Sequence, residues 1–436
     1  MEFPRVIVIS NNSFSNNSSN GRTLGNLFIG WPKDRLAQFC ISTTEPNYEL
    51  CDNYFLLTDR SALDGFVHFK KARRCDIKTN RNTQGNTIIG GKKQVKTPFT
   101  ALLRHIIWSN KRWNSREFQS WVDLFNPDLL LVMNSDATFI LDIATEMSKR
   151  RRIPLIMFNT EGYYFFKKNY YAHSYCFDNT LFRIYQSIYR SHFRRMMKQV
   201  VLSVHLNSLL EHDYLHEFGG KSMVKYTSSN MSFDISDLNM EQPSFNYLGN
   251  FGYDRMSALI DVAEVLQSIN PEYKLNIYGS IPNDEARVKM EACSGIIYRG
   301  TVPYSEVIKV IYHSTILFHA ESQSKEFAEF LKYGFSTKIA DSISSGHPFL
   351  MYSSPDIAGA KYVIETGAAW YASDKKELKD CIISILTDMA KREQVAEIAR
   401  QTAIENHDLQ HNAVSFQNAL KILFQDKYNY SNNGKI

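Results

Sequence analysis

Residues 333–346, which read YGFSTKIADSISSG, combine a helix start with side chains that bind anions. Ser336 or Thr337 can cap the helix N-terminus, and Gly346 stands where a left-handed C-cap belongs. Lys338 in the first turn opposes the helix dipole, unless an anion binds both the lysine and the free backbone N–H groups. A phosphate fits this chemistry. An ordinary crossover helix with a surface lysine is the other interpretation of the stretch alone.

A carboxylate and an imidazole stand close together ahead of this stretch. The apolar run 315–320 contains His319, and Glu321 follows it directly. Because ligands of parallel sheets bind beyond the carboxyl ends of the strands, Glu321 is a candidate contact. For His319 a buried histidine with satisfied hydrogen bonds is an equally good interpretation.

The sequence gives no sign of a metal site or a disulfide framework. No D-x-D motif occurs, so the usual signal for a metal-bound diphosphate is missing. The cysteines form no CxxC pair and no His-rich spacing; they are Cys40, Cys51, Cys75, Cys176, Cys293 and Cys381. This scatter favours a reducing cytosol.

Length and charge limit the classes of protein. A chain of 436 residues with 44% hydrophobic content exceeds the roughly 250 to 300 residues of a single core, so we expect two domains. The net charge of +5, from 50 basic and 45 acidic residues, is too small to indicate a nucleic-acid partner. Neither a signal peptide nor a membrane span is predicted, so we expect a cytoplasmic protein that at most lies on a membrane.

The positioning elements of the N-terminal half alternate between strands and helices. Apolar runs at 6–9, 129–133 and 153–158 are typical of strands buried on both faces of a parallel sheet, and 200–204 is predicted as the last strand of the domain. A polar, glycine-containing loop, 10–23, follows the first run. We expect a doubly wound domain over residues 1–235.

A second alternation fills the C-terminal half. Its predicted strands are 245–248, 275–278, 295–298, 315–320 and 348–352, and helices at 378–386 and 393–404 end the chain. We expect a second doubly wound domain over 236–436. Two such domains facing each other across a cleft would both contribute to one ligand site.

Several short motifs occur in a fixed order between Tyr247 and Ala369. They are a Y-L-G turn followed by Arg255, I-Y-G at 277–279, G-T-V at 300–302, F-H-A-E-S at 318–322 and the 333–346 stretch. This order resembles the nucleotide-sugar-binding domain of GT-B glycosyltransferases. It is most similar to the family 4 enzymes that synthesise bacterial capsular and O-antigen (lipopolysaccharide) polysaccharides.

The resemblance implies roles for the donor-side residues. Arg255 would contact the donor diphosphate, and Asn250 stands where the family often has a second arginine, which Lys338 would replace. Asp341 matches the second member of the family's acidic pair and would bind ribose hydroxyls. Tyr333 replaces the first member, whose contact Glu321 would take over. The implied donor-binding residues are Gly249, Asn250, Arg255, Tyr278, Gly279, His319, Glu321, Tyr333, Ser336, Thr337, Lys338 and Asp341.

The resemblance also implies a catalytic scheme without metal or cofactor. Helix N-termini with Arg255 and Lys338 would stabilise the diphosphate leaving group. The N-terminal domain would bind the acceptor through Asn20, Gly21, Arg22, Thr23, Asp136 and Glu161. Glu161 is our first choice for the group that orients or deprotonates the acceptor hydroxyl. Asp136 is the second, and a helix N-cap is an equally good interpretation of it.

We therefore predict a glycosyltransferase, of hexosyltransferase type, that transfers a sugar from a nucleoside-diphosphate sugar to a saccharide or a lipid-linked saccharide. Retention of configuration is implied by the family alone. A nucleotide-sugar epimerase of the same fold and a non-catalytic membrane- or partner-binding scaffold are the alternatives. The basic, aromatic segment 181–200 fits either a peripheral membrane helix at the inner face of the cell membrane or a core helix with a solvated basic face.

Overall fold

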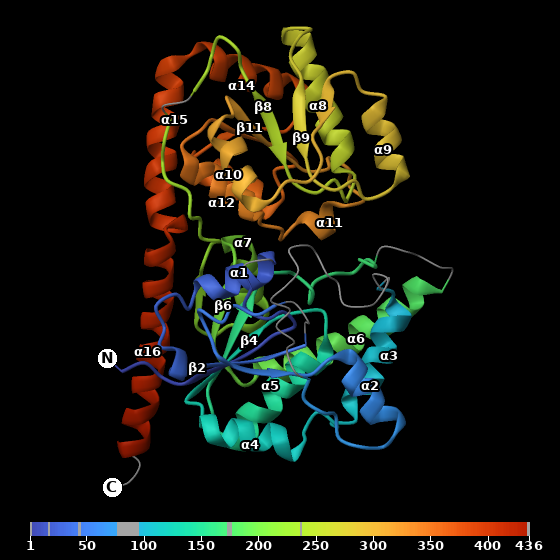
Figure 1. Cartoon of the computed structure of the whole chain (residues 1–436), viewed down its shortest axis with the longest axis vertical. Coiled ribbons are helices and arrows are strands. Elements are labelled where there is room, and N and C mark those ends of the chain that lie inside the picture. The colour runs from blue at the N-terminus through green and yellow to red at the C-terminus, as the bar shows by residue number, and fades with distance from the viewer. Residues whose placement is uncertain are drawn as a thin grey trace. The chain divides into compact units, whose positions relative to one another are not determined.

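The computed structural model describes residues 2–15, 18–41, 45–75, 96–171, 177–235 and 238–433, with side chains as far as residue 426 (Figure 1). Cys176 and part of the expected loop 10–23 lie outside these residues. The chain forms two compact units. Unit 1 comprises Met1–Leu206, Glu211–Val224 and Ala413–Ile436, and unit 2 comprises Asn207–Leu210 and Lys225–Asn412.

Unit 1 is built on a parallel sheet of seven strands in the order β3-β2-β1-β4-β5-β6-β7. All residues of its central strands are buried, as expected for a sheet that helices cover on both faces. The strands are β1 (Val6–Ile9), β2 (Leu36–Cys40), β3 (Asn53–Leu56), β4 (Leu129–Met133), β5 (Leu155–Asn159), β6 (Val200–His205) and β7 (Ser222–Val224). The helices are α1 (Ser19–Asn26), α2 (Asp59–Val67), α3 (Pro98–Ser109), α4 (Arg116–Phe125), α5 (Thr138–Arg151), α6 (Asp178–Met197) and α7 (Ser208–Phe218), with a short 3₁₀ helix at Lys33–Arg35.

Helix α6 agrees with the core-helix interpretation of residues 181–200. Its apolar side is buried within unit 1 through Phe182, Tyr185, Tyr189, Phe193 and Met196, as the core-helix interpretation expects. Its basic side remains exposed for much of its length. Within the described ranges, no helix has the length and apolar character needed to cross a membrane.

Unit 2 contains a second parallel sheet, with the order β10-β9-β8-β11-β12-β13. The strands are β8 (Phe245–Leu248), β9 (Leu275–Tyr278), β10 (Ile296–Tyr298), β11 (Ile316–Ala320), β12 (Phe349–Tyr352) and β13 (Trp370–Ala372). The helices are α8 (Arg255–Ile269), α9 (Asp284–Glu291), α10 (Tyr304–Tyr312), α11 (Ala328–Leu331), α12 (Thr337–Ser345), α13 (Ala358–Thr366), α14 (Lys375–Thr387) and α15 (Met389–Thr402), which runs into a π-helical turn at Ala403–His407.

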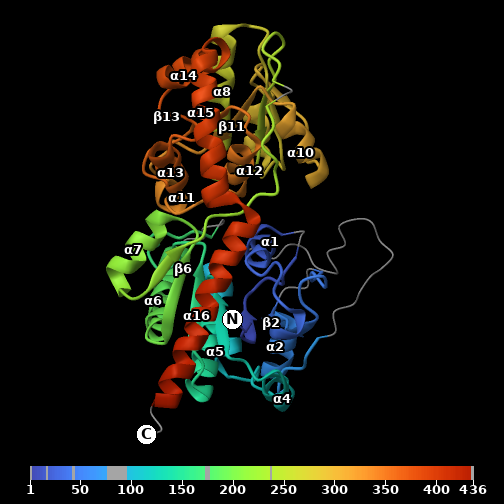
Figure 2. The same ribbon diagram turned by 90° about the vertical axis from the view of Figure 1, so that its left-hand side faces the viewer.

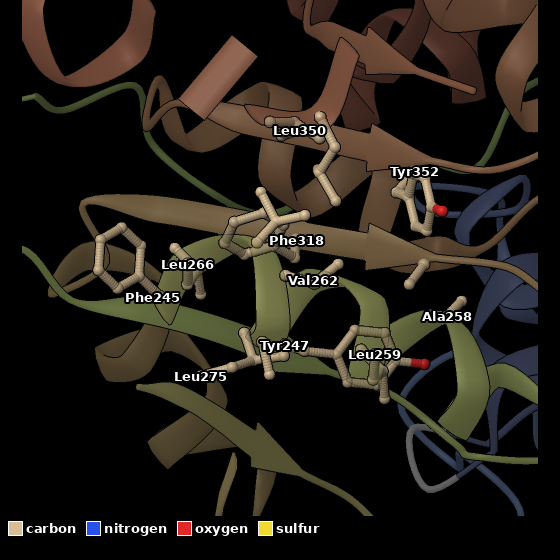
Figure 3. Close-up of a cluster of buried hydrophobic side chains, with 14 of the residues drawn as sticks. Phe245, Tyr247, Ala258, Leu259, Val262, Leu266, Leu275, Phe318, Leu350 and Tyr352 are labelled. Carbon is tan, nitrogen blue, oxygen red and sulfur yellow. The ribbon is translucent and has the colours of Figure 1, made fainter. Parts of the chain in front are cut away.

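The core of unit 2 lies between its sheet and the helices beside it. Leu259, Val262 and Leu266 of α8 pack against Tyr247 of β8 and Phe318 of β11 (Figure 3). All five are less than 5% exposed. This packing fixes the strands whose carboxyl ends carry the candidate donor residues.

The last helix, α16 (Leu409–Asn433), changes the expected domain division at 235/236. The chain enters unit 2 at Lys225, and α16 returns to unit 1 from Ala413 onward (Figures 1 and 2). There Gln417 donates hydrogen bonds to the carbonyls of Leu27 and Ile29, at 3.3 and 2.8 Å, and Phe416 packs against Phe28. The helices expected at 378–386 and 393–404 are therefore not the last of the chain.

The helix predicted after residue 335 is confirmed as α12. Ser336 caps it, since its hydroxyl accepts a hydrogen bond from the Lys338 amide at 3.3 Å. Gly346 ends it at a φ of 86°, a backbone conformation that favours glycine.

Candidate active site

The strand orders show where each sheet can bind a ligand. In unit 2 the order of strands reverses direction between β8 and β11, and in unit 1 between β1 and β4. At such switch points the loops that follow the two strands turn to opposite faces, and the gap between them is the usual ligand site of an open parallel sheet. The segments after β8 and β11 carry Arg255 and Glu321.

Arg255 and Glu321 form a buried ion pair at the switch point of unit 2. The Arg255 Nε lies 2.6 Å from Glu321 Oε2, and Nη2 lies 3.0 Å from Oε1. His319 adds its Nε2, 3.1 Å from the same Oε1. Burial raises the pKa of Glu321, but the His319 hydrogen bond and the Arg255 charge outweigh it, so that the pKa lies below its usual value.

Most hydrogen-bond donors of the Arg255 guanidinium are used within unit 2. Its Nη1 also donates to Asn250 Oδ1 and to the carbonyl of Gly252. With two N–H groups on Glu321, four of the five guanidinium donors have partners. Arg255 is therefore held in place by Glu321 and Asn250, and in this arrangement it has one N–H left for a phosphate oxygen.

Gly249 and Gly279 bring the loops after β8 and β9 into direct backbone contact. Gly279 has a φ of 154°, and a Cβ added to it would lie 1.8 Å from the Gly249 carbonyl oxygen. The Gly249 amide donates to the carbonyl of Tyr278 at 3.0 Å. The close approach of the two loop backbones therefore accounts for glycine at these positions without a bound ligand.

The first turn of α12 is partly exposed. Ser336, Thr337 and Lys338 are half-buried, so the free N–H groups of this turn and the lysine lie on the same accessible end of the helix. Such an end attracts anions through its backbone N–H groups and its dipole.

Two residues beside this turn are buried. Asp341 is 4% exposed, and its Oδ1 accepts a hydrogen bond from Ser229 Oγ at 2.7 Å. Tyr333 is 3% exposed; its carbonyl accepts from Asn207 Nδ2 at 3.0 Å, and its hydroxyl accepts from Lys332 Nζ at 3.0 Å. The tyrosine that replaces the family's carboxylate therefore packs inside unit 2.

The expected loop residues 20–23 of unit 1 belong to helix α1 instead. The Ser18 hydroxyl accepts from the Gly21 amide at 3.1 Å and starts the helix before Asn20. Gly21 is required there, because a Cβ would lie 2.5 Å from Ser18 Oγ and 2.6 Å from the Ser13 carbonyl oxygen. Asn20 is exposed, Arg22 is half-buried and Thr23 is buried.

Asp136 is not the N-cap of the helix that follows it. Helix α5 begins after Ala137, without a side-chain cap. The Asp136 carboxylate instead pairs with Lys96 Nζ at 3.3 Å, and its carbonyl accepts from the Tyr185 hydroxyl. The N-cap interpretation is therefore wrong, and the carboxylate is neutralised by a lysine.

Glu161 is a candidate base whose pKa is raised. It follows β5, and burial raises its pKa from 4.5 to about 7. The structure gives its carboxyl no hydrogen bond or ion pair to another described residue. A carboxyl with a pKa near neutrality can accept and return a proton at physiological pH.

A buried polar network at the strand ends of unit 1 was not predicted from the sequence. Asn134, Asn159 and His205 stand at or just after the ends of β4, β5 and β6. Asn134 Nδ2 donates to Asn159 Oδ1 at 2.8 Å, the Tyr189 hydroxyl donates to Asn134 at 2.8 Å, and Asn159 Nδ2 lies 3.5 Å from His205 Nδ1. Burial lowers the pKa of His205 to about 4, so it is neutral. The available signal was a polar residue closing each of three apolar runs.

The candidates thus fall into separate groups. Unit 2 brings together Arg255, Glu321, His319 and Asn250, and it places Ser336, Thr337 and Lys338 on one helix end. Glu161, Asp136 and residues 20–23 belong to unit 1. No group of His, Cys, Asp and Glu side chains in the described part of the chain could hold a metal ion.

The comparisons with known proteins agree with this architecture. Residues 258–418 match a family described as glycosyl transferase-like. No curated protein matches the chain in sequence.

Solved structures share the fold over nearly the whole chain at low sequence identity. Sucrose-phosphate synthase from Thermosynechococcus elongatus is 12% identical, with a TM-score of 0.63 over 97% of this chain and 100% of that chain. HepE from Anabaena in complex with UDP and glucose is 12% identical, with a TM-score of 0.60 over 96% and 99%. WaaG, a glycosyltransferase involved in lipopolysaccharide biosynthesis, is 12% identical, with a TM-score of 0.55 over 95% and 99%. The chain therefore has the GT-B fold of two Rossmann-like units, and its residues 258–418 are similar to the glycosyl transferase-like family.

Proposed function

We propose that the protein is a glycosyltransferase that transfers a sugar from a nucleoside-diphosphate sugar to a hydroxyl of a saccharide or a lipid-linked saccharide. One observation carries the proposal: the half-buried first turn of α12, with Lys338, lies in the region that is similar to the glycosyl transferase-like family. The turn offers N–H groups, a dipole and an ammonium to one anion.

The donor diphosphate would bind at the first turn of α12. Lys338 would take the place of the second arginine that the related enzymes have near Asn250. Arg255 would add one N–H, held in position by its pair with Glu321. Helix N–H groups and two fixed cations would stabilise the negative charge that develops as the glycosidic bond breaks, without a metal ion.

The acceptor hydroxyl would lose its proton to Glu161. Its pKa of about 7 suits a group that must be ionised to accept a proton and must also release it. The complex of HepE with UDP and glucose makes a uridine diphosphate sugar the first donor to test. Retention of configuration, family 4 membership and a role in capsule or lipopolysaccharide synthesis belong to the same proposal, as does contact of the basic side of α6 with the inner face of the cell membrane.

A binding experiment with a matched pair of lysines tests the donor site. Lys338 and Lys376 are each the second residue of a helix in unit 2, and Lys376 is exposed. In a thermal-shift screen of nucleotide sugars, only donors that bind the folded state raise the midpoint. Lys338→Ala should reduce donor affinity about tenfold or more, and Lys376→Ala should leave it unchanged.

Equal donor affinity and equal turnover in the two variants would reject the site. Product analysis separates the transferase from the epimerase alternative: transfer yields a free nucleoside diphosphate and a longer acceptor, whereas an epimerase converts the donor sugar with no acceptor present.

A further inference from the structure

A basic pocket in unit 1 includes none of the residues assigned above to donor or acceptor binding. It has a volume of about 330 Å³ and lies between α6 and the segment that follows Glu161 (α6 is green in Figure 1). Its lining consists of Phe166, Lys167, Phe182, Arg183, Gln186, Ser187, Arg190 and Arg194. Four of these side chains are cationic, and none of the described residues that line it is acidic.

The spacing on α6 places these side chains on one face. Arg183, Ser187, Arg190 and Arg194 follow one another at steps of three or four residues, which is the repeat of one helix face. Gln186 lies three residues after Arg183 and four before Arg190. Phe166 and Phe182, both less than 5% exposed, form the apolar part of the wall. Like charges that gather on one face repel each other, so this face favours an anion.

Two of the arginines are already fixed in place. Arg190 donates from Nε to the carbonyl of Tyr164 at 2.9 Å and from Nη2 to that of Phe166 at 3.0 Å. Arg194 Nε donates to the Tyr164 hydroxyl at 2.8 Å, and this hydroxyl donates to Glu217 at 2.6 Å. Glu217 itself lies 3.9 Å from Arg194 and is a carboxylate at the edge of the cluster. The guanidinium groups are thus preorganised, which lowers the entropy cost of binding an anion.

Gln186 gives the pocket a hydrogen-bond acceptor. Its Nε2 donates to the carbonyls of Tyr163 and Phe166, at 2.6 and 3.0 Å, which fixes the orientation of the amide. Its Oε1 is buried and has no hydrogen-bond partner among the described residues, and the residue as a whole is 3% exposed. A buried acceptor without a partner is rare in folded proteins, and a hydroxyl on a bound ligand would satisfy it.

We infer that this pocket binds a phosphate group that carries a neighbouring hydroxyl, such as a phosphorylated polyol. The arginines would grip the phosphate oxygens, since a guanidinium matches them with two parallel N–H groups. Gln186 Oε1 would accept from the hydroxyl. The same chemistry occurs in a soluble polyol phosphate and in the glycerophosphate headgroup of a membrane lipid, so the experiment must separate these two sources.

Isothermal titration calorimetry of the full chain, without donor or acceptor, tests the site directly. Glycerol 3-phosphate should bind with one site per chain, about tenfold more tightly than sulfate, which has no O–H group to give to Gln186. Vesicle co-sedimentation with phosphatidylglycerol, against phosphatidylcholine vesicles as the control, tests the headgroup. Binding of glycerol 3-phosphate assigns a soluble ligand, and binding to phosphatidylglycerol vesicles alone assigns the lipid.

Substitutions at exposed positions should leave the fold intact, so that a change in affinity reports on the pocket. Arg183 is exposed and has no ion pair within the described residues, so Arg183→Gln should fold normally and weaken binding about tenfold. Ser187→Glu places a carboxylate in the pocket and should abolish binding. Arg195→Gln is the matched control in the glycerol 3-phosphate titration, because Arg195 lies on the same helix outside the pocket. The inference is overturned if neither ligand binds, or if Arg195→Gln weakens glycerol 3-phosphate binding as much as Arg183→Gln.

Discussion

The two units differ in how their candidate residues are charged. In unit 2 the candidate charges are already paired, whereas unit 1 holds neutral polar groups and one carboxyl that has no hydrogen bond or ion pair to another described residue. In unit 2, Arg255 and Glu321 hold each other, and the Glu321 pKa lies below its usual value. In unit 1, Asn134, Asn159 and His205 are linked without charge, and burial raises the pKa of Glu161 to about 7. Paired charges fix geometry, whereas a half-buried carboxyl with a raised pKa can exchange a proton near neutral pH.

The contrast between the paired charges of unit 2 and the proton-exchanging carboxyl of unit 1 would fail most clearly if Glu161 had no role in proton transfer. Glu161→Gln keeps the shape of the side chain, and we expect it to lower kcat about a hundredfold to ten-thousandfold. Since the base must be ionised, wild-type activity should rise with pH through about 7, and this rise should be missing from the variant. Steady-state kinetics over a pH series measures both effects.

Asp136→Asn is the control for that experiment, because Lys96 already neutralises Asp136. Its kcat should stay within about tenfold of the wild type. A larger loss in Asp136→Asn than in Glu161→Gln would reverse the assignment of the base.

Removing one partner of the charged pair tests the other side of the comparison. Glu321→Ala leaves the Arg255 charge buried and uncompensated, so the free energy of unfolding should fall by about 3–5 kcal/mol. Urea denaturation followed by circular dichroism measures the change. Glu326→Ala, at an exposed position of the same unit, should change stability by less than about 0.5 kcal/mol. A small effect of Glu321→Ala would show that the pair contributes little to holding Arg255.

A smaller effect is expected where a neutral donor supports a charge in unit 2. Ser229→Ala removes the hydrogen bond to Asp341 and leaves its carboxylate buried without that donor. We expect a loss of about 1–3 kcal/mol in unfolding free energy, together with weaker donor binding. Ser232→Ala, in the same segment but exposed and bonded through its backbone, is the control. Unchanged stability and donor affinity in Ser229→Ala would contradict the role of this bond.

The smallest effect should appear in the pH dependence of stability. Because the folded-state pKa of Glu161 lies above its unfolded value of 4.5, the folded state holds the proton more tightly. This contribution is fully present below about pH 4.5 and is lost as the pH rises through about 7. Glu161 is partly exposed, so we expect only about 1 kcal/mol. The unfolding free energy of Glu161→Gln, compared with the wild type at both ends of this range, should lack that fall.

Local sequence signals predicted the elements that depend on neighbouring residues. Ser336 and Gly346 mark both ends of α12, and the apolar runs mark the central strands, because caps and buried strands are determined within a few residues. Interactions between distant residues could not be predicted in the same way. Arg255 and Glu321 are 66 residues apart and Ser229 and Asp341 are 112 apart, so that only the fold brings them together.

The start of α1 and the division into units differ from the expectation for one reason: both depend on contacts that the local sequence pattern does not show. The start of α1 was missed because the constraint on Gly21 comes from the Ser13 carbonyl, not from a helical pattern. The compact units differ from the expected division at 235/236, because an amphipathic helix shows which face is apolar but not which unit that face will cover. Helix α16 covers the unit at the other end of the sequence.

The return of α16 also affects the order in which the protein can be completed during synthesis. The hydrogen bonds from Gln417 join residues 390 and 388 positions away, so unit 1 lacks helix α16 until the residues of that helix have left the ribosome. Until then Phe28 lacks its contact with Phe416. A nascent chain, or a fragment that ends at residue 235, would present this apolar surface to solvent and to chaperones. The first unit to begin folding is therefore the last to be finished.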